Sequence, residues 1–432
     1  MKKITLNYKT LRNRALIGAF IGYAIYYFCR VNISMALPAM QAELGFSKIQ
    51  LGLIVSGLQI AYGIGKFLNG VIADRTNPRF IMASGLLLSG LANLFFGLNT
   101  TLWILVVTWG ANGWFQSMGF PAGARLLSHW YLPTEYGRIW SIFGCSHQIG
   151  AAIIYLAGGY LVLLGWQYAF IVPSVLAILG SFFLFYYLTD VPEKIGLPSI
   201  EEYSGKNAIE PVINAEKNIF KSDLVRYVLT NRAIWFVGFG NMFLYIVRYG
   251  ITVWTPLFIS TYKGIEVTKA GWVLAIFELV GVLGMLLAGY ISDRTFNARR
   301  GPVMSIYMFF LSLCILLIWI APFGNLLLLF TILGMCGFLV YGPLMLVSVA
   351  AATFSGKKAA ATASGFTGFW GYVGATISGV GVGAAAQYYG WKGAFIFILL
   401  SGILSACFFA LTWKSDPPFP SANQLNTSDV SE

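Results

Sequence analysis

Apolar segments of about 20 residues or more recur along almost the whole chain, separated by short polar stretches. Each is long enough to cross ~30 Å of hydrocarbon as an α-helix, which rises about 1.5 Å per residue. Twelve such segments cover roughly residues 14–38, 49–73, 80–98, 101–124, 139–163, 167–189, 232–260, 268–292, 301–321, 325–353, 359–387 and 392–413. The pattern therefore predicts an all-α integral membrane protein with twelve transmembrane helices.

The apolar pattern is interrupted between the sixth and seventh segments. Residues 190–231 are polar, contain proline and carry charges of both signs, which is typical of a linker. We therefore expect an N-terminal six-helix bundle at 1–189, a cytoplasmic linker at 190–231 and a C-terminal six-helix bundle at 232–413. Residues 414–432 are expected to form a short polar cytoplasmic tail.

Composition agrees with a membrane protein. The chain has 432 residues, of which 58% are hydrophobic and 10% charged, and its mean hydropathy is +0.73, far outside the range of soluble domains. The first segment is too long for a secretory signal and has no small-residue cleavage site, so we expect it to remain as a helix. The five cysteines form no CxxC motif or Cys/His cluster, so neither a metal site nor a disulfide is expected.

The net charge of +12 is distributed unevenly between the two sides of the membrane. Of 28 lysines and arginines, 21 fall in the loops on the side of the N-terminus, four on the opposite side and three within segments. By the positive-inside rule, both termini are expected to be cytoplasmic. The excess charge is thus explained by topology and lipid contact, and no nucleic-acid partner is expected. We expect the protein to act as a monomer.

A repeated loop indicates that the two halves are related. "GVIADRTNPR" follows the second segment and "GYISDRTFNARR" follows the eighth, which places Asp74 and Asp293 219 residues apart. Each Asp-Arg pair alone is compatible with a charge cluster that closes a helix, but their shared position favours a structural latch. These loops and the six-plus-six layout resemble the major facilitator superfamily, whose members alternate access by rocking one half against the other.

Arginines lie inside the first and seventh segments. Arg30 and Arg248 are 218 residues apart, so equivalent helices carry them. Burying an arginine at the centre of a membrane helix costs on the order of 3 kcal/mol, and such residues usually face a cavity. Structural pairing and snorkelling remain the alternatives.

One acid, Glu278, lies well inside a segment, and it cannot neutralise Arg30, Lys66 and Arg248 together. At least two positive charges therefore remain for a ligand, which we expect to be anionic and doubly charged. The planar guanidinium group suits bidentate binding of phosphate.

Other candidates follow from helical spacing. Tyr26 and Tyr27 lie three or four residues from Arg30, and Tyr245 lies three from Arg248, so each shares a face with its arginine, although core packing is equally compatible. Lys66 either adds positive potential or pairs with a carbonyl, and Glu278 either balances a cation or joins a hydrogen bond between helices.

His147, in the fifth segment, has two interpretations. In the first interpretation, the imidazole is neutral and forms a hydrogen bond with a backbone carbonyl. The other is a proton shared with a ligand, because histidine and the second ionisation of a phosphate group both titrate near pH 6 to 6.5.

Several stretches resemble the organophosphate:inorganic phosphate antiporters, which include glycerol-3-phosphate and hexose-6-phosphate transporters and a related hexose-phosphate sensor. They are "YYFCRVNISMALP" around Arg30, "GKFLNGVIADRTNPR" around Lys66, "CSHQIG" around His147, "YIVRYG" around Arg248 and "KKAAATASGFTGFWGYVG" at 357–374. The resemblance implies that Arg30 and Arg248 bind phosphate and that His147 adjusts to substrate protonation. It implies a transporter, not an enzyme, that exchanges organic phosphate for inorganic phosphate without ATP or a cofactor.

The sequence departs from the family at positions that concern the organic half of the substrate. Glycerol-3-phosphate transporters carry a lysine directly after the first arginine and an acid five residues after the second, where this chain has Val31 and Val253. The charges that hexose-phosphate transporters carry in the eleventh segment are also missing, and its glycines indicate close helix packing. The choice between a sugar phosphate, such as glucose-6-phosphate, and glycerol-3-phosphate stays open. A sensor of the same fold that signals to a membrane kinase is the alternative function.

Overall fold

The computed structural model describes residues 2–204, 228–320, 326–356 and 359–415. The contacts divide the chain into two compact units: unit 1 comprises Met1–Pro211 and Thr252–Glu278, and unit 2 comprises Val212–Ile251 and Leu279–Glu432. Two long helices, α11 and α12, contribute residues to both units. Residues 205–227 of the expected linker and 416–432 of the expected tail lie outside the described residues, and the division into halves stays a prediction.

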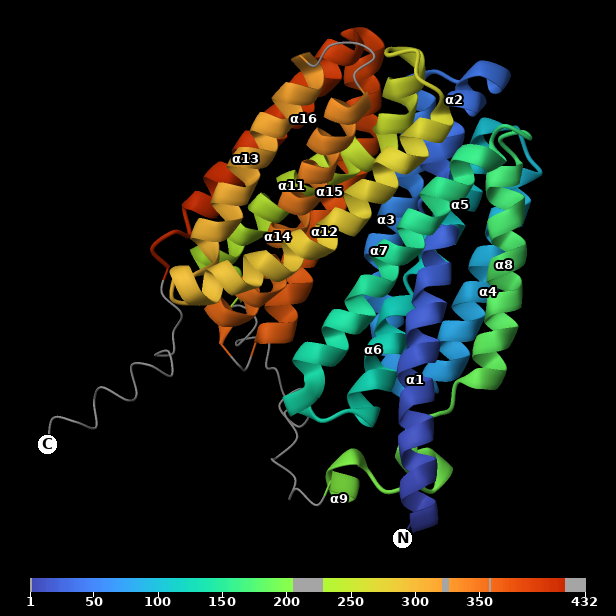
Figure 1. Cartoon of the computed structure of the whole chain (residues 1–432), viewed down its shortest axis with the longest axis vertical. Helices are drawn as coiled ribbons and strands as arrows, with labels where there is room; N and C mark the ends of the chain where they lie inside the picture. Colours follow the sequence, from blue (N-terminus) through green and yellow to red (C-terminus); the bar gives the residue numbers. More distant parts are fainter. Residues whose placement is uncertain (1, 205–227, 321–325, 357–358, 416–432) are drawn as a thin grey trace, which may run out of the picture. The chain divides into compact units, whose positions relative to one another are not determined.

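Unit 1 is built from helices that run along one another. Its elements are α1 (Lys2–Phe28), α2 (Ile33–Leu44), α3 (Lys48–Arg75), α4 (Pro78–Gly97), α5 (Leu102–Gln116), α6 (Gly119–Trp130), η1 (Pro133–Glu135), α7 (Tyr136–Leu161), α8 (Tyr168–Tyr187), η2 (Pro192–Ile195) and α9 (Ile200–Ser204). In Figure 1, α4 lies beside α8, and both belong to the same side of the unit as α1. The α3 helix packs along α5, and α1 packs along α7.

Glycines bring the backbones of these helices close together. A Cβ atom at Gly113 of α5 would overlap the carbonyl oxygen of Leu58 in α3, and one at Gly150 of α7 would overlap that of Ala24 in α1. In a membrane, small residues of this kind permit the close van der Waals packing that holds helices together. The glycines therefore fix the distances of α3 and α7 from their neighbours.

The first apolar segment is not one continuous helix, as the sequence analysis expected. The α1 helix ends at Phe28 and α2 begins at Ile33, with a turn between them. The carbonyl oxygen of Cys29, which the break releases, accepts hydrogen bonds from Asn93 Nδ2 at 2.9 Å and Asn112 Nδ2 at 2.7 Å. Irregular backbone is tolerated in a membrane where buried polar groups satisfy it. The break is thus built into unit 1 by amides of α4 and α5.

Unit 2 contains the remaining helices. They are parts of α11 (Arg232–Thr261) and α12 (Val267–Thr295), with α13 (Arg300–Ile320), α14 (Leu326–Ser355), α15 (Ala360–Tyr388) and α16 (Gly390–Ala410). The α13 helix packs against α14 and α16, and α15 packs against the same two helices. A Cβ atom at Gly374 of α15 would overlap the carbonyl oxygen of Met242 in α11, so this glycine of the eleventh segment serves close packing.

The apolar segments of the sequence match the helices closely. Among the described residues, nine spans are long and apolar enough to cross a membrane, including Tyr8–Leu44, which contains the break between α1 and α2. Every segment predicted from the sequence coincides with a helix or a broken helix, although α1 begins at Lys2, twelve residues before the first predicted segment. An all-α membrane fold is therefore confirmed.

The repeated Asp-Arg loops lie at helix ends. In unit 2, Arg300 Nη1 donates to Asp293 Oδ1 at 2.5 Å and to Ser292 Oγ at 2.8 Å, which ties the start of α13 to the end of α12. In unit 1, Arg125 Nη1 donates to the carbonyls of Ala73 and Thr76 at the end of α3, while the Asp74 side chain lies outside the described part of the chain. In unit 1 the arginine thus bonds to carbonyl groups at a helix C-terminus, and in unit 2 the arginine pairs with a carboxylate there.

The start of the chain packs on the short helix α9. The ring of Tyr8 stacks on that of Tyr203 with centroids 4.0 Å apart, and Arg12 forms an ion pair with Glu135. Burial raises the pKa of Tyr131, which therefore stays neutral while its hydroxyl donates to the Arg12 carbonyl at 3.2 Å. In Figure 1 the N-terminus and α9 lie at the same end of unit 1.

Candidate functional site

Arg30 lies in the break between α1 and α2, where two aromatic rings surround its guanidinium group. The guanidinium carbon lies 3.9 Å from the ring centroid of Tyr62 and 5.2 Å from that of Tyr27. Arg30 is 5% exposed. Aromatic faces stabilise a desolvated cation through their quadrupole without cancelling its charge. The surroundings of Arg30 therefore hold a positive charge in place inside unit 1.

A second cation follows on the same face of α3. Lys66 lies four residues, about one helical turn, after Tyr62. The Tyr62 hydroxyl is hydrogen-bonded to Arg30 and Tyr23 and lies within electrostatic range of Lys66. The Lys66 ammonium lies 5.8 Å from the ring centroid of Phe120 in α6. Arg30 and Lys66 thus both act on one phenol, so positive potential accumulates on this side of α3.

His147 joins the group from α7. Its ring lies 5.2 Å from the ring of Tyr27, which also contacts Arg30. Nδ1 is hydrogen-bonded to the carbonyl of Gly144, and a carbonyl can only accept, so Nδ1 carries a hydrogen. In the neutral ring Nε2 is then the nitrogen that takes up a proton. The backbone bond that was one interpretation of His147 is present, and it sets the tautomer.

Arg248 has a comparable aromatic environment in unit 2. Its Nη2 donates to the hydroxyl of Tyr341 in α14 at 3.0 Å, and its guanidinium carbon lies 5.3 Å from the ring centroid of Tyr249. Arg248 is 7% exposed. The ring of Tyr245 lies 5.8 Å from that of Tyr249 and 5.7 Å from that of Tyr372 in α15. Each unit therefore contains one deeply buried arginine surrounded by tyrosines.

Two of the candidate residues from the sequence have other contacts. Tyr26 is fully buried and its hydroxyl donates to the carbonyl of Met82 in α4 at 2.8 Å, so the structure does not bring this hydroxyl to Arg30. Glu278 is 2% exposed, and its backbone carbonyl accepts a hydrogen bond of 3.4 Å from Gln148, the residue after His147. The structure therefore brings Tyr27, His147 and Lys66 together with Arg30, and Tyr245 together with the rings beside Arg248.

The sequence analysis missed the tyrosines closest to the two arginines. Tyr62 could have been found, because it lies one turn before Lys66 and the same spacing rule identified Tyr27. Tyr341 gave no such signal, since its partner Arg248 lies 93 residues away on another helix. Within the described ranges, no group of three His, Cys, Asp or Glu side chains could hold a metal ion.

The fold has counterparts among solved membrane-protein structures. It matches the crystal structure of a bacterial homologue of the human lysosomal transporter Spinster with a TM-score of 0.78, at 15% identity, over 94% of this chain and 97% of that chain. The Major Facilitator Superfamily signature matches residues 19–379. The chain belongs to this superfamily and, within it, to the organophosphate:inorganic phosphate antiporter family, as the sequence resemblance implied.

Three relatives from bacteria support this assignment. A probable hexose phosphate transport protein of Chlamydia pneumoniae is 40% identical, with 94% of this chain and 92% of that protein covered. A glycerol-3-phosphate transporter of Bacillus subtilis is 38% identical, with 96% and 95% covered. The membrane sensor protein UhpC of Escherichia coli is 35% identical, with 94% and 92% covered.

Proposed function

We propose that the protein exchanges an organic phosphate for inorganic phosphate by alternating access, with Arg30 and Arg248 binding the phosphoryl group. The observation that carries the proposal is the pair of buried guanidinium groups, 5% and 7% exposed, one in each unit. Tyrosines, which hold a cation without discharging it, surround both groups. Relatives named as hexose phosphate and glycerol-3-phosphate transporters support an organophosphate as the cargo.

Phosphate binding accounts for exchange. A phosphoryl dianion accepts two parallel N–H bonds from each guanidinium group, which lowers the repulsion between two cations. By this proposal the site without phosphate does not reorient, whereas binding of either phosphate compound lets the protein change its access. Transport is driven by the opposing gradients and needs neither ATP nor a cofactor.

His147 and Lys66 have auxiliary roles in this proposal. His147 Nε2 shares a proton with the phosphate, which lets the site bind both the monoanion and the dianion. Lys66 adds positive potential on the α3 side, and Glu278 offsets part of the positive charge. Tyr27 and Tyr245 position the arginines through the ring contacts of each unit.

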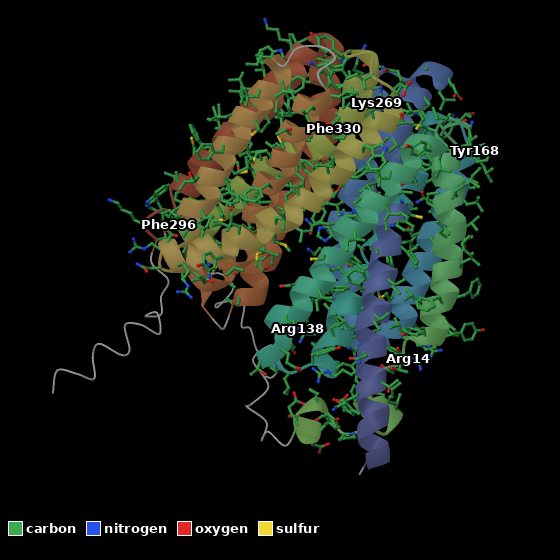
Figure 2. The ribbon with its side chains drawn as sticks, in the orientation of Figure 1. Arg14, Arg138, Tyr168, Lys269, Phe296 and Phe330 are labelled. Atoms are coloured by element: carbon green, nitrogen blue, oxygen red, sulfur yellow. The ribbon has the colours of Figure 1, made fainter. Side chains whose placement is uncertain are left out.

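The proposed setting is the inner membrane of a bacterium, with both termini in the cytoplasm and the protein acting as a monomer. The distribution of lysine and arginine supports this orientation. Figure 2 shows Arg14 of α1 and Arg138 of α7 toward one end of unit 1 and Tyr168 toward the other.

Counterflow in proteoliposomes tests the proposal. Vesicles containing the purified protein are loaded with labelled inorganic phosphate and then exposed separately to glycerol-3-phosphate, glucose-6-phosphate and phosphoglycerate. We expect rapid loss of label with at least one of these compounds and none with buffer alone. Release of label without any external phosphate compound, or none in any arm, would contradict exchange.

A second candidate function is sensing, and the 35% identity to a membrane sensor protein favours it. A sensor binds the same ligands and passes the signal to a membrane kinase. Deletion of the gene distinguishes the two functions. Loss of organophosphate uptake indicates transport, whereas loss of the induction of another transporter, with basal uptake unchanged, indicates sensing.

A further inference from the structure

Gln59 of α3 is a buried amide that stands apart from the others. Eight asparagine and glutamine side chains are buried in the described part of the chain: Asn32, Gln59, Asn69, Asn93, Asn112, Gln116, Gln148 and Asn241. The amide nitrogens of the other seven donate to carbonyls or side chains. Gln59 is 4% exposed, its Oε1 has no hydrogen-bond partner, and its nitrogen has no bond to any described residue either.

An amide in this condition is unfavourable for the protein without ligand. Removing a polar group from water without replacing its hydrogen bonds is destabilising, and buried polar groups in folded proteins are nearly always bonded. An apolar side chain of similar size at the same position would avoid this penalty. The side chain therefore indicates that a bound molecule, and not one of the described protein groups, completes its hydrogen bonds.

The position of Gln59 relates it to the site around Arg30. Gln59 lies three residues before Tyr62 and seven before Lys66 on the same helix. Seven residues turn an α-helix through about 700°, so Gln59 and Lys66 share a face within about 20°. With a rise of about 1.5 Å per residue, Gln59 lies about 4.5 Å along the helix from Tyr62, whose ring contacts the Arg30 guanidinium at 3.9 Å.

The distance fits the organic half of a phosphate ester. A phosphoryl group bound at Arg30 would have its nearest carbon-bound hydroxyl groups about three or four bonds from the ester oxygen, in reach of a side chain about one helical turn away. The amide oxygen accepts a hydrogen bond and the amide nitrogen donates one, so a single glutamine pairs with two neighbouring hydroxyl groups. It carries no charge and does not compensate a carboxylate.

We propose that Gln59 is the residue that recognises the hydroxyl groups of the substrate and so favours hydroxylated phosphate esters over esters without hydroxyl groups. This inference rests on the proposed binding of phosphate at Arg30. Gln59 selects among phosphate esters and has no part in binding inorganic phosphate itself. A site that hydrogen-bonds a substrate hydroxyl rejects analogues without it, because its polar atoms are then left without partners.

The test is ligand binding to the purified full-length protein, measured by ligand-induced thermal stabilisation, which does not depend on transport. The ligands are inorganic phosphate, methyl phosphate, glycerol-3-phosphate, glucose-6-phosphate and 3-phosphoglycerate. The variant Gln59→Met removes the amide at nearly constant length. We expect the affinity of this variant for glycerol-3-phosphate and glucose-6-phosphate to fall about 5-fold or more. Its affinities for inorganic phosphate and methyl phosphate should stay within about 2-fold of wild type. The melting temperature of the ligand-free variant should rise.

Two further variants keep the test decisive. Gln116→Met removes an amide whose nitrogen donates to the Tyr26 carbonyl and the Ser89 hydroxyl, so it should lower the melting temperature and leave the affinity ratios unchanged. If Gln59→Met does not fold, Gln59→Asn retains the amide one methylene shorter and should still shift the ratio of hydroxylated to methyl ester.

Each possible outcome decides between the proposals. Equal affinities for hydroxylated and methyl esters in the wild type, or unchanged ratios in the Gln59 variants, would overturn the role of Gln59 while phosphate binding stands. If the wild type binds none of the five compounds, the proposed function fails as well. Binding without exchange in vesicles supports the sensor and retains Gln59 as the selective residue.

Discussion

The guanidinium carbon of Arg30 lies 3.9 Å from the ring centroid of Tyr62, although the two residues are 32 positions apart in the sequence. This contact links the turn after α1 to the middle of α3. It holds in place an arginine whose backbone belongs to neither α1 nor α2. Tyr62 thus acts as a positioning residue for the group that we propose to bind phosphate. The contact has two parts, the aromatic face and the hydroxyl, and substitutions separate them.

Tyr62→Phe retains the aromatic face and removes the hydroxyl, whereas Tyr62→Leu removes both. A cation–π contact contributes about 0.5–2 kcal/mol, so we expect Tyr62→Leu to weaken phosphate binding about 2- to 30-fold and Tyr62→Phe to weaken it less. Titration of labelled phosphate on the purified variants measures this. Equal loss in the two variants would show that the hydroxyl alone matters.

The break between α1 and α2 gives a prediction on stability. Asn112 Nδ2 donates to the Cys29 carbonyl at 2.7 Å inside unit 1, so Asn112→Leu leaves one of the two bonds to that oxygen missing and introduces a branched side chain. We expect the free energy of unfolding to fall by about 1–3 kcal/mol, seen as a lower melting temperature in detergent.

A matched control exists on the surface. Asn99 Nδ2 donates to the Phe95 carbonyl at an exposed position at the end of α4, so Asn99→Leu should change the melting temperature little. A similar decrease for both variants would contradict the role of Asn112 at the break.

The helices could be predicted from the sequence, but the break could not. A segment such as 14–38 is predominantly apolar because lipid and the helix interior both favour apolar side chains, and hydropathy therefore does not distinguish a straight helix from a broken one. The signal for the break lies in Asn93 and Asn112, which are 64 and 83 residues away from Cys29. Long-range hydrogen bonds of this kind have no periodicity along the chain.

The close approach of α7 and α12 within unit 1 gives a third prediction. A Cβ atom at Gly271 of α12 would overlap the carbonyl oxygen of Tyr155 in α7, and backbone cannot move aside as a flexible side chain can. Gly271→Ala should therefore lower the free energy of unfolding by about 1–3 kcal/mol. Thermal unfolding in detergent measures the change.

Gly289, on the same helix, is the matched control, because nothing lies within 4 Å of the position of its Cβ. Gly289→Ala should stabilise the protein by about 0.5–1 kcal/mol, since alanine loses less conformational freedom in a helix. If both alanines act in the same direction, the contact between α7 and α12 is not as tight as described.

The hydroxyl of Tyr341 gives a fourth prediction, for unit 2. It accepts a hydrogen bond of 3.0 Å from Arg248 Nη2, so Tyr341→Phe leaves a buried guanidinium with one bond fewer. A hydrogen bond to a charged group contributes about 1.5–3 kcal/mol, and we expect phosphate affinity to fall about 10-fold or more through poorer positioning of Arg248. Tyr307→Phe is the control, because the buried Tyr307 hydroxyl has no partner in the described residues. Equal affinities in the two variants would exclude this role of Tyr341.

The arginines themselves could be predicted from the sequence because a charge in an apolar segment is conspicuous. Arg30, Lys66, Arg248 and Glu278 are the charged residues well inside the predicted segments, and their cost of burial limits the interpretations. Tyrosines give no such contrast, since an apolar helix contains them for packing as often as for binding. Tyr26 and Tyr27 are adjacent in sequence, yet one bonds to the Met82 carbonyl and the other contacts Arg30.

The most direct measurement is the exchange of labelled inorganic phosphate for unlabelled phosphate in proteoliposomes that contain wild type, Arg30→Lys or Arg248→Lys, with Arg14→Lys as a control. Lysine keeps the charge but lacks the planar pair of donors, so we expect exchange to fall about 100-fold or more in the first two variants. Arg14 donates to the Tyr187 carbonyl at 2.9 Å, outside both arginine clusters, and its variant should exchange at the wild-type rate. Normal exchange by Arg30→Lys or Arg248→Lys, in protein that inserts and folds, would contradict the proposal that these two guanidinium groups bind the phosphate.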